Sequence, residues 1–243
     1  MNGTLYLIPN TLGDSAPEHL PFVLPAEVRA LALRLDYFVG ENAKTTRAYL
    51  KQLGVTRPLQ EIEIRELNVK TPADAVDALL GPLLDGRDAG LVSEAGCPAV
   101  ADPGAALVRR AHERGLTVRP LVGPSSILLA LMASGLDGQR FAFNGYLPTD
   151  AGERRRVLTE LEGHSRRHRQ TQVFIETPYR NAALFEALLA DCQPTTRLSL
   201  AIDLTLAGET VASASVAEWR KRMSSGRIPD MKKRPTIFML LAQ

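Results

Sequence analysis

Cysteine, aromatic residues, long apolar runs and an excess of charge of either sign are all scarce in this chain of 243 residues. Cys97 and Cys192 lie far apart and form no CxxC pair, so neither a disulfide framework nor a metal site is expected. The longest apolar run, residues 127–133, is too short to cross a membrane. No basic segment precedes the apolar residues 5–8, so we expect no signal peptide and a globular protein of the reducing cytoplasm.

The formal net charge is only +2, which is too small to identify a nucleic-acid-binding protein, because phosphate binding depends on local density of positive charge. Basic residues do gather in two places, and either solvated helix faces or RNA contacts would explain them. The first cluster contains Arg154, Arg155, Arg156, Arg166, Arg167, His168 and Arg169, and the C-terminal cluster contains Arg220, Lys221, Arg222, Arg227, Lys232, Lys233 and Arg234.

Short β-branched and leucine-rich runs alternate with helical patterns, which is typical of an α/β protein whose strands are covered on both faces. Apolar residues at positions 185, 188, 189 and 192 form one helical stripe that we expect to pack on a sheet. A second stripe over residues 76–84 contains Gly81-Pro82, which predicts a kink or an early end. The predicted strands are residues 4–8, 36–39, 89–93, 118–121, 142–143, 173–175, 198–202 and 236–241.

A turn at residues 122–126 separates a predicted strand from an almost wholly apolar helix, which we expect to be buried. We place a domain junction at this turn, so that residues 1–121 form an N-terminal α/β domain and residues 122–243 a C-terminal one. Each half then has the usual size of an independent core.

The loops after the strands are where function is expected, because open α/β sheets bind ligands outside the carboxyl ends of their strands. Residues 9–14 have neither dinucleotide-fold nor Walker A spacing, and a tight turn explains them as well as a ligand contact does. Residues 94–104 form a long loop of small residues, in which Asp102 followed by Pro103 predicts a helix cap. Residues 123–126 place two hydroxyls at a helix start, and residues 176–180 end a strand with a carboxylate, an aromatic ring and a guanidinium.

Taken in order, these segments resemble the motif series of the tetrapyrrole methylase superfamily, most closely its branch of ribosomal-RNA ribose 2′-O-methyltransferases. The similarity runs from residue 3 to about residue 209. One such motif is weak, whereas an ordered series is specific. The matching segments are GTLYLI at 3–8, LVSEAGCP at 91–98, DPG at 102–104, GPS at 123–125, SGL at 134–136, NGYLP at 144–148, ETPYR at 176–180 and DLT at 203–205.

The resemblance implies two α/β domains with S-adenosylmethionine bound in the cleft between them, and a homodimer. The cofactor contacts that it implies by position are Thr11, Glu94, Ala95, Gly96, Cys97, Val100, Ser125, Ser126, Glu176 and Ile202. One segment departs from the family pattern, because A-E-D-T-R-x-T reads GENAKTT at residues 40–46 and loses an aspartate and an arginine. The methyl acceptor therefore stays open between ribosomal RNA and a tetrapyrrole or other small molecule.

Methyl transfer from a sulfonium disperses positive charge in the transition state, so a site that positions the reactants and excludes water favours it. A ribose hydroxyl also needs a base within hydrogen-bond reach. We predict Glu41 as that base, with Lys44 or Arg180 orienting the acceptor; the alternative for Glu41 is a solvated carboxylate at a strand end. A non-catalytic module that binds S-adenosylmethionine or RNA is the remaining interpretation.

Overall fold

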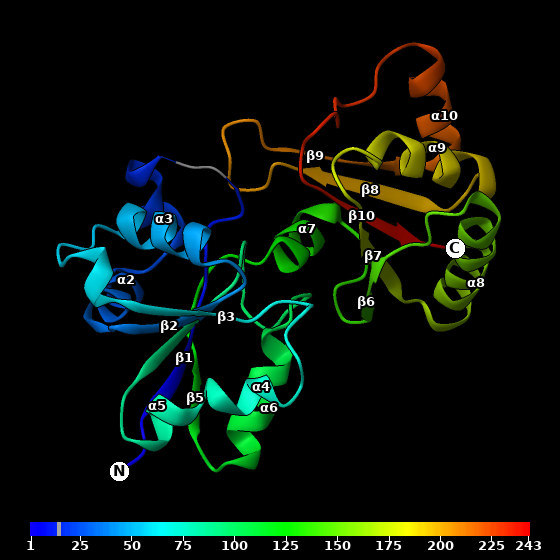
Figure 1. Cartoon of the computed structure of the whole chain (residues 1–243). Coiled ribbons are helices and arrows are strands. Elements are labelled where there is room, and N and C mark those ends of the chain that lie inside the picture. Colours follow the sequence, from blue (N-terminus) through cyan, green and yellow to red (C-terminus); the bar gives the residue numbers. More distant parts are fainter. Residues whose placement is uncertain (14–15) are drawn as a thin grey trace. The chain divides into compact units, whose positions relative to one another are not determined.

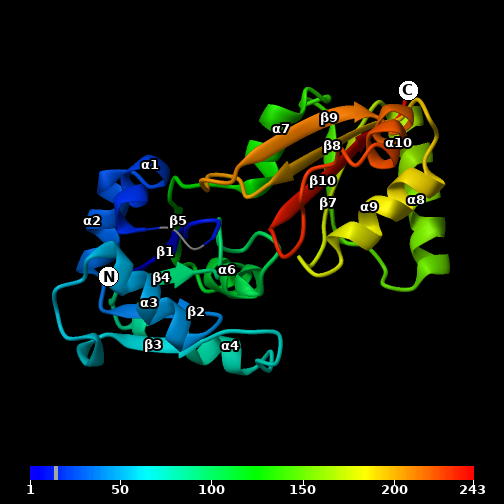
Figure 2. The same ribbon diagram turned by 90° about the horizontal axis from the view of Figure 1, so that it is seen from above.

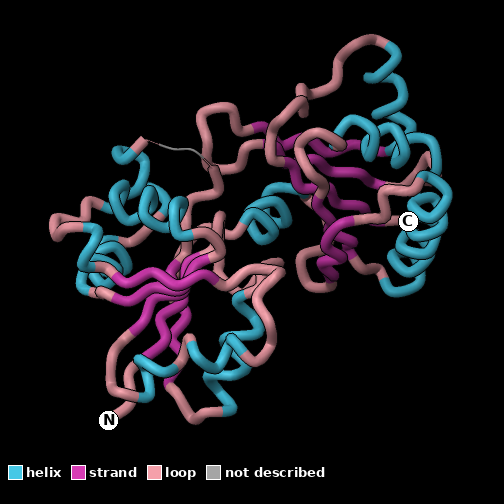
Figure 3. The backbone as a smooth tube through the Cα atoms, in the orientation of Figure 1, coloured by secondary structure: helices cyan, strands magenta, loops and turns pink. Residues whose placement is uncertain are grey.

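The computed structural model describes residues 1–13 and 16–243, so Asp14 of the first candidate loop lies outside the described residues. The chain divides into two compact units, Met1–Ser125 and Ser126–Gln243. Each unit contains its own β-sheet with helices against it, which confirms the α/β fold class (Figures 1 and 3). No helix in the described part of the chain is long and apolar enough to cross a bilayer.

The described part of the first unit contains a five-stranded sheet in which all neighbouring strands are parallel. Its order is β3-β2-β4-β1-β5, and the strands span Thr4–Ile8 (β1), Tyr37–Gly40 (β2), Glu63–Glu66 (β3), Ala89–Val92 (β4) and Thr117–Pro120 (β5). The central strands β2 and β4 are buried along their whole length, as expected for a parallel sheet covered on both faces.

Alternate residues of these strands face two different cores. Phe38 packs into one core with residues from α1 (Leu20–Val23), α2 (Ala26–Arg34) and α3 (Ala43–Leu53). Tyr37 and Val39 pack into the other, with residues from α4 (Ala75–Ala78), α5 (Gly81–Leu84) and α6 (Gly104–Glu113). The described part of the first unit also contains two single-turn 3₁₀ helices, at Pro17–His19 (η1) and Leu59–Glu61 (η2).

The second unit has a mixed sheet of order β6-β7-β10-β8-β9. β6 and β7 are parallel, and the other pairs are antiparallel. The strands span Phe141–Tyr146 (β6), Thr171–Ile175 (β7), Arg197–Ile202 (β8), Thr210–Ser215 (β9) and Thr236–Leu241 (β10). β7 and β8 both run antiparallel to β10, so they run parallel to each other and their carboxyl ends reach the same edge of the sheet.

Helices also cover this sheet from two sides (Figures 1 and 2). One face packs against α8 (Ala151–His168), α9 (Asn181–Asp191) and α10 (Val216–Ser224) in a single apolar core that includes Trp219. The predicted stripe of α9 lies in this core, as expected. On the other face, α7 (Ser126–Ser134) contacts β8, β9 and β10.

Two features differ from the sequence prediction, and one is confirmed. α7 is not a buried helix, because only Ala130, Leu131 and Ser134 are buried and the Met132 side chain is 79% exposed. A helix with apolar residues on all sides is expected to be buried on all sides. In the structure, one face of α7 packs against the sheet of the second unit. The edge strands β3 and β9 were not predicted. The break near Gly81-Pro82 is confirmed, since α4 ends at Ala78 and a separate short helix, α5, begins at Gly81.

Candidate functional site in the strand-end loops

The loops after β1 and β4 lie side by side at the centre of the first sheet. β1 continues into α1 and α2 on one face, and β4 continues into α6 on the other. Adjacent parallel strands whose connections leave towards opposite faces form the crevice in which α/β folds bind ligands. The sheet order β3-β2-β4-β1-β5 therefore places both loops at the expected position of a ligand site.

Hydrogen bonds join these two loops into one unit. The Asn10 backbone N–H donates to the Gly96 carbonyl (2.9 Å), and the Gly96 N–H donates to the Thr11 carbonyl (3.2 Å). The Asn10 side-chain amide donates to the carbonyls of Ser93 (3.0 Å) and Glu94 (3.1 Å). These hydrogen bonds therefore hold the loop after β1 and the loop after β4 in a fixed position relative to each other.

A third loop, after β5, packs against the same place. Gly96 has φ +68°, and a Cβ there would lie 3.2 Å from Leu12 Cδ2 and 3.4 Å from the Pro124 carbonyl oxygen. The Cys97 thiol lies 3.5 Å from that same oxygen, and burial raises its pKa. A Cβ on Gly123 would lie only 2.2 Å from Pro9 Cβ. Gly123 therefore leaves no room for a side chain where the loops meet, and the left-handed backbone at Gly96 favours glycine.

The loop before α6 carries backbone strain. Ala99 (φ 65°) and Ala101 (φ 60°) are both in the left-handed region, which costs about 1–3 kcal/mol each for a non-glycine residue. Asp102 holds this conformation, because its carboxylate accepts from the N–H groups of Ala99 (2.8 Å) and Gly104 (2.6 Å). Burial raises the pKa of Asp102, and these two N–H groups partly offset the rise. Asp102 thus caps the first helical N–H as predicted, but Pro103 is the N-cap residue rather than the first helical one.

The loop after β2 brings Glu41 to the same group. A Glu41 carboxylate oxygen accepts from the Glu94 backbone N–H at 3.3 Å. Burial is the main cause that raises the pKa of Glu41, and the neighbouring carboxylates of Asp102 and Glu94 raise it further against the effect of that hydrogen bond. Asn42 then caps α3 by accepting from the N–H of Lys44 at 2.8 Å.

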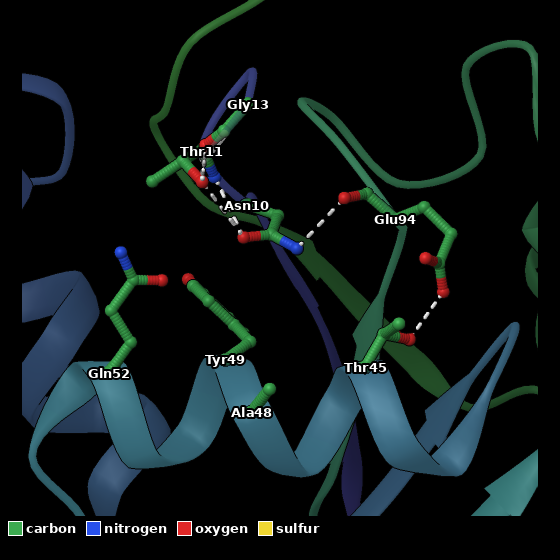
Figure 4. A pocket seen from close by; sticks show the side chains of 8 residues that line it. All are labelled: Asn10, Thr11, Gly13, Thr45, Ala48, Tyr49, Gln52 and Glu94. Atoms are coloured by element: carbon green, nitrogen blue, oxygen red, sulfur yellow. Dashed lines mark hydrogen bonds between the residues drawn. The ribbon is translucent and has the colours of Figure 1, made fainter. Parts of the chain in front are cut away.

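A cavity of about 380 Å³ opens beside these loops (Figure 4). Its volume is in the range of about 300–1,000 Å³ found for small-molecule sites. The Tyr49 hydroxyl, whose pKa burial raises, donates to the Pro9 carbonyl at 2.6 Å, and the Thr45 hydroxyl lies 2.6 Å from a Glu94 carboxylate oxygen. The lining residues are Asn10, Thr11, Gly13 and Glu94 from the loops and Thr45, Ala48, Tyr49 and Gln52 from one face of α3.

The second unit has its own cluster at the carboxyl ends of β7 and β8. The Glu176 carboxylate, of which 2% is exposed, accepts from Arg180 (2.6 Å) and from the Thr177 N–H (2.6 Å). β8 ends at Ile202, and the next residue, Asp203, has φ 50°. The Ile202 side chain is fully buried in the core, so any ligand contact there would use its backbone.

The structure brings some of the predicted site residues together and leaves others apart. In the first unit Thr11, Glu41, Glu94, Gly96 and Cys97 meet through the contacts above. Three others are exposed, and their side chains form no hydrogen bond or ion pair within the described residues: Lys44, Ala95 and Val100. In the second unit Glu176 and Arg180 form an ion pair. Ser125 and Ser126 are the last residue of the first unit and the first of the second.

Four lining residues escaped the sequence prediction. They come from α3 at positions 45, 48, 49 and 52, which lie on one helical face. The available signal was that spacing, which continues the 40–46 segment already identified as unusual. Within the part of the chain that the structure describes, no group of three or more His, Cys, Asp or Glu side chains could hold a metal ion.

Comparison with known proteins matches this arrangement to one family. The family model for tetrapyrrole (corrin/porphyrin) methylases matches residues 20–219. A relative from Neisseria meningitidis serogroup B, named ribosomal RNA small subunit methyltransferase I, is 36% identical over 227 residues, which cover 93% of this chain and 72% of the relative. A relative of the same name from Escherichia coli O157:H7 is 31% identical over 232 residues, covering 94% and 76%.

Solved structures of similar fold share less sequence. The methyltransferase CobJ superposes with a TM-score of 0.63 at 18% identity, over 99% of this chain and 94% of that one. A cobalt precorrin-4 methyltransferase, CbiF, superposes with a TM-score of 0.59 at 14% identity, over 98% and 94%. At these identities the likeness concerns the fold.

Proposed function

Because this chain belongs to the tetrapyrrole methylase family and is an S-adenosylmethionine-dependent methyltransferase, we propose that its acceptor is the ribose 2′-hydroxyl of small-subunit ribosomal RNA. The observation that carries the choice of acceptor is the 36% identity over 93% of the chain to a protein named for the small ribosomal subunit. The similarity to corrin-pathway enzymes concerns the fold and names no acceptor for this chain.

The residues at the strand ends of the first unit fit the cofactor. Three loops meet there at two glycines, of which Gly123 leaves no room for a Cβ and Gly96 has a left-handed backbone, and the adjoining cavity has the volume of a small-molecule site. S-adenosylmethionine supplies an electrophilic methyl group on a sulfonium. We propose that the residues in contact with it are Thr11, Glu94, Ala95, Gly96, Cys97, Val100, Ser125, Ser126, Glu176 and Ile202.

Glu41 is our candidate for the base that takes the ribose proton. It lies at the end of a buried strand, next to Glu94, and the raised pKa makes it a better proton acceptor than an ordinary glutamate. Lys44 follows three residues later with an exposed side chain that is available to a phosphate. Arg180, the second candidate to orient the acceptor, is held by Glu176 and so has a fixed guanidinium.

The proposal has two further features, the location of the protein and its oligomeric state. An enzyme of the small ribosomal subunit acts where ribosomes are, so we propose a cytoplasmic location. We also propose a homodimer, and the exposed apolar side chain of Met132 on α7 supports it as a surface that a second copy would cover.

The proposal is tested by incubating the protein with radiolabelled S-adenosylmethionine and either stripped small ribosomal subunits, their deproteinised RNA, or a panel of tetrapyrroles. We expect label in the ribosomal RNA alone. Label in a tetrapyrrole would move the activity to a small-molecule acceptor. Calorimetric binding of the cofactor without label in any acceptor would instead favour a non-catalytic module.

A further inference from the structure

Several of the basic residues identified in the sequence already have partners within the described residues. In the first cluster Arg155 pairs with Asp191 (2.7 Å), Arg156 pairs with Glu160 (3.6 Å), and Arg166 donates to the Gln243 carbonyl (3.0 Å). These contacts give three members of the cluster a role within the second unit, whereas Arg167 and Arg169 are exposed and form no ion pair within the described residues.

The residues of the C-terminal cluster divide into those whose side chains have charged, backbone or aromatic partners and those that form no ion pair in the described part of the chain. Arg220 donates to two backbone carbonyls, Arg222 lies over the Trp219 ring, and Arg234 pairs with Asp203 at 2.7 Å. The remaining members are exposed and form no ion pair within the described residues: Lys221, Arg227, Lys232 and Lys233. Lys232 and Lys233 are adjacent and border a cavity.

This cavity lies between the loop after β7 and the segment that leads into β10. Its volume is about 500 Å³, and its walls are mostly apolar. The Tyr179 ring stands at its edge with 81% of the residue exposed. The lining residues are Pro178, Tyr179, Ala182, Ile228, Pro229, Asp230, Met231, Lys232 and Lys233.

Buried contacts hold the two walls together. The Asn181 side-chain amide, in a residue only 1% exposed, donates to the carbonyls of Met231 (3.2 Å) and Arg234 (2.7 Å). The Lys233 N–H donates to the Pro178 carbonyl at 3.3 Å. The cavity is thus formed in advance of any ligand, with its lysines on a fixed backbone.

We propose that this cavity, which we call the Tyr179 cavity, receives one unpaired nucleotide of the RNA acceptor, with its base against the Tyr179 ring and its phosphates near Lys232 and Lys233. The inference rests on the proposed RNA methylation and names where the acceptor is held. Sequence-tolerant RNA binding combines aromatic platforms with cationic side chains in this way. Asp230 opposes it with one negative charge, but its carboxylate is engaged by the Lys232 N–H at 2.9 Å.

The position of the cavity suits this role. Tyr179 and Arg180 are consecutive, and Arg180 is held by the buried carboxylate of Glu176 at the end of β7. The same five-residue loop therefore carries a proposed cofactor contact, a proposed acceptor-orienting group and the ring on which a base would stack.

The test measures binding of a short, labelled, unpaired ribo-oligonucleotide by fluorescence anisotropy at several salt concentrations. Tyr179→Ala should weaken binding about 5- to 150-fold, the loss typical of one stacked base, whereas Tyr179→Phe should bind as the parent does. Lys232→Gln/Lys233→Gln should make the slope of log K against log salt shallower by about 1.4. The matched control, Lys70→Gln/Arg109→Gln, removes two exposed cations of the first unit that form no ion pair within the described residues and should leave the slope unchanged.

The same variants are assayed for methyl transfer to stripped small subunits, where Tyr179→Ala should raise KM while cofactor affinity and thermal stability stay at parental values. If the parent methylates ribosomal RNA but Tyr179→Ala and the double lysine variant match it in Kd, salt slope and KM, the inference about the Tyr179 cavity is wrong and the proposed function stands. Cross-linking of Tyr179 to a ribosomal protein rather than to RNA would also overturn the inference. A parent that neither binds nor methylates RNA would refute the proposed function itself.

Discussion

Glu41 is the residue on which the proposed chemistry depends most. Its pKa is raised mainly by burial, so the ionised, proton-accepting form is reached at a higher pH than for an ordinary glutamate. We expect kcat/KM to rise with pH through that pKa. Glu41→Gln should abolish this acidic limb and lower kcat/KM about 10²- to 10⁴-fold, with cofactor affinity unchanged in calorimetry.

The direction in which the Glu41 pKa is coupled to folding stability provides a folding control for Glu41→Gln. A carboxyl whose folded-state pKa is raised binds its proton more tightly in the fold, so its ionisation at higher pH lowers stability. Neutral glutamine removes that effect, and Glu41→Gln should melt no lower than the parent at neutral pH. Full turnover of the variant would show that Glu41 is a solvated carboxylate and that another group takes the proton.

Gly96 tests whether the meeting of the three loops serves the cofactor. Alanine in a left-handed conformation costs about 1–2 kcal/mol, so Gly96→Ala should lower the free energy of unfolding by that amount or more. The control is Gly115→Ala, at nearly the same φ (+67°) but with no heavy atom within 4 Å of the added Cβ. Both should lose stability in urea titrations, and only Gly96→Ala should also lose affinity for S-adenosylmethionine. Equal affinities in the two variants would remove Gly96 from the cofactor site.

At the scale of elements, a hydrogen bond from Tyr49 links α3 to the loop after β1. Tyr49 is 3% exposed, and its hydroxyl donates to the Pro9 carbonyl. Tyr49→Phe leaves that buried carbonyl without its donor and should cost about 1–3 kcal/mol of stability in chemical denaturation. Tyr146→Phe, at a tyrosine 58% exposed, is the control and should be neutral. Identical midpoints for the two variants would show that α3 does not anchor this loop.

The elements that the sequence predicted are those with a strong apolar signal. The strands at residues 4–8 and 236–241 agree with β1 and β10 at both ends, because each is a largely apolar run with a proline at one end. β3 reads Glu-Ile-Arg-Glu and β9 reads Thr-Val-Ala-Ser-Ala-Ser, so as partly exposed edge strands they lack such a run. The same limit explains the missed face of α3, because Thr45, Ala48 and Gln52 give no apolar signal and Tyr49 alone belongs both to the buried side of the helix and to the cavity lining.

The loops were predictable as candidates because the position of a loop relative to its strand follows from the α/β pattern. Their hydrogen bonds were not, since Asn10 reaches Ser93 and Glu94 across more than 80 positions. Likewise, the sequence showed a cluster of basic residues near the C-terminus but not that Arg234 is paired with Asp203. Such pairings depend on the sheet order, which no local pattern contains.

At the scale of the whole molecule, the proposed homodimer has a direct test. Light scattering on the 26.5-kDa chain should give twice that mass, and Met132→Asp should shift it towards the monomer because a charge replaces an exposed apolar side chain on α7. Met223→Asp would perturb a core and is unsuitable as a control, whereas Val69→Asp changes a 90% exposed residue of the first unit and should stay dimeric. A monomeric parent would contradict the dimer and would remove α7 as its interface.

The central claim, methyl transfer to a ribose 2′-hydroxyl of small-subunit ribosomal RNA, is tested most directly by locating the transferred methyl group. Ribosomal RNA labelled by the parent enzyme is hydrolysed in alkali, which needs a free 2′-hydroxyl at each cleaved linkage. We predict that the label stays in an alkali-resistant dinucleotide. Label released in mononucleotides would place the methyl on a base, and an unlabelled RNA beside a labelled small-molecule acceptor would contradict the claim altogether.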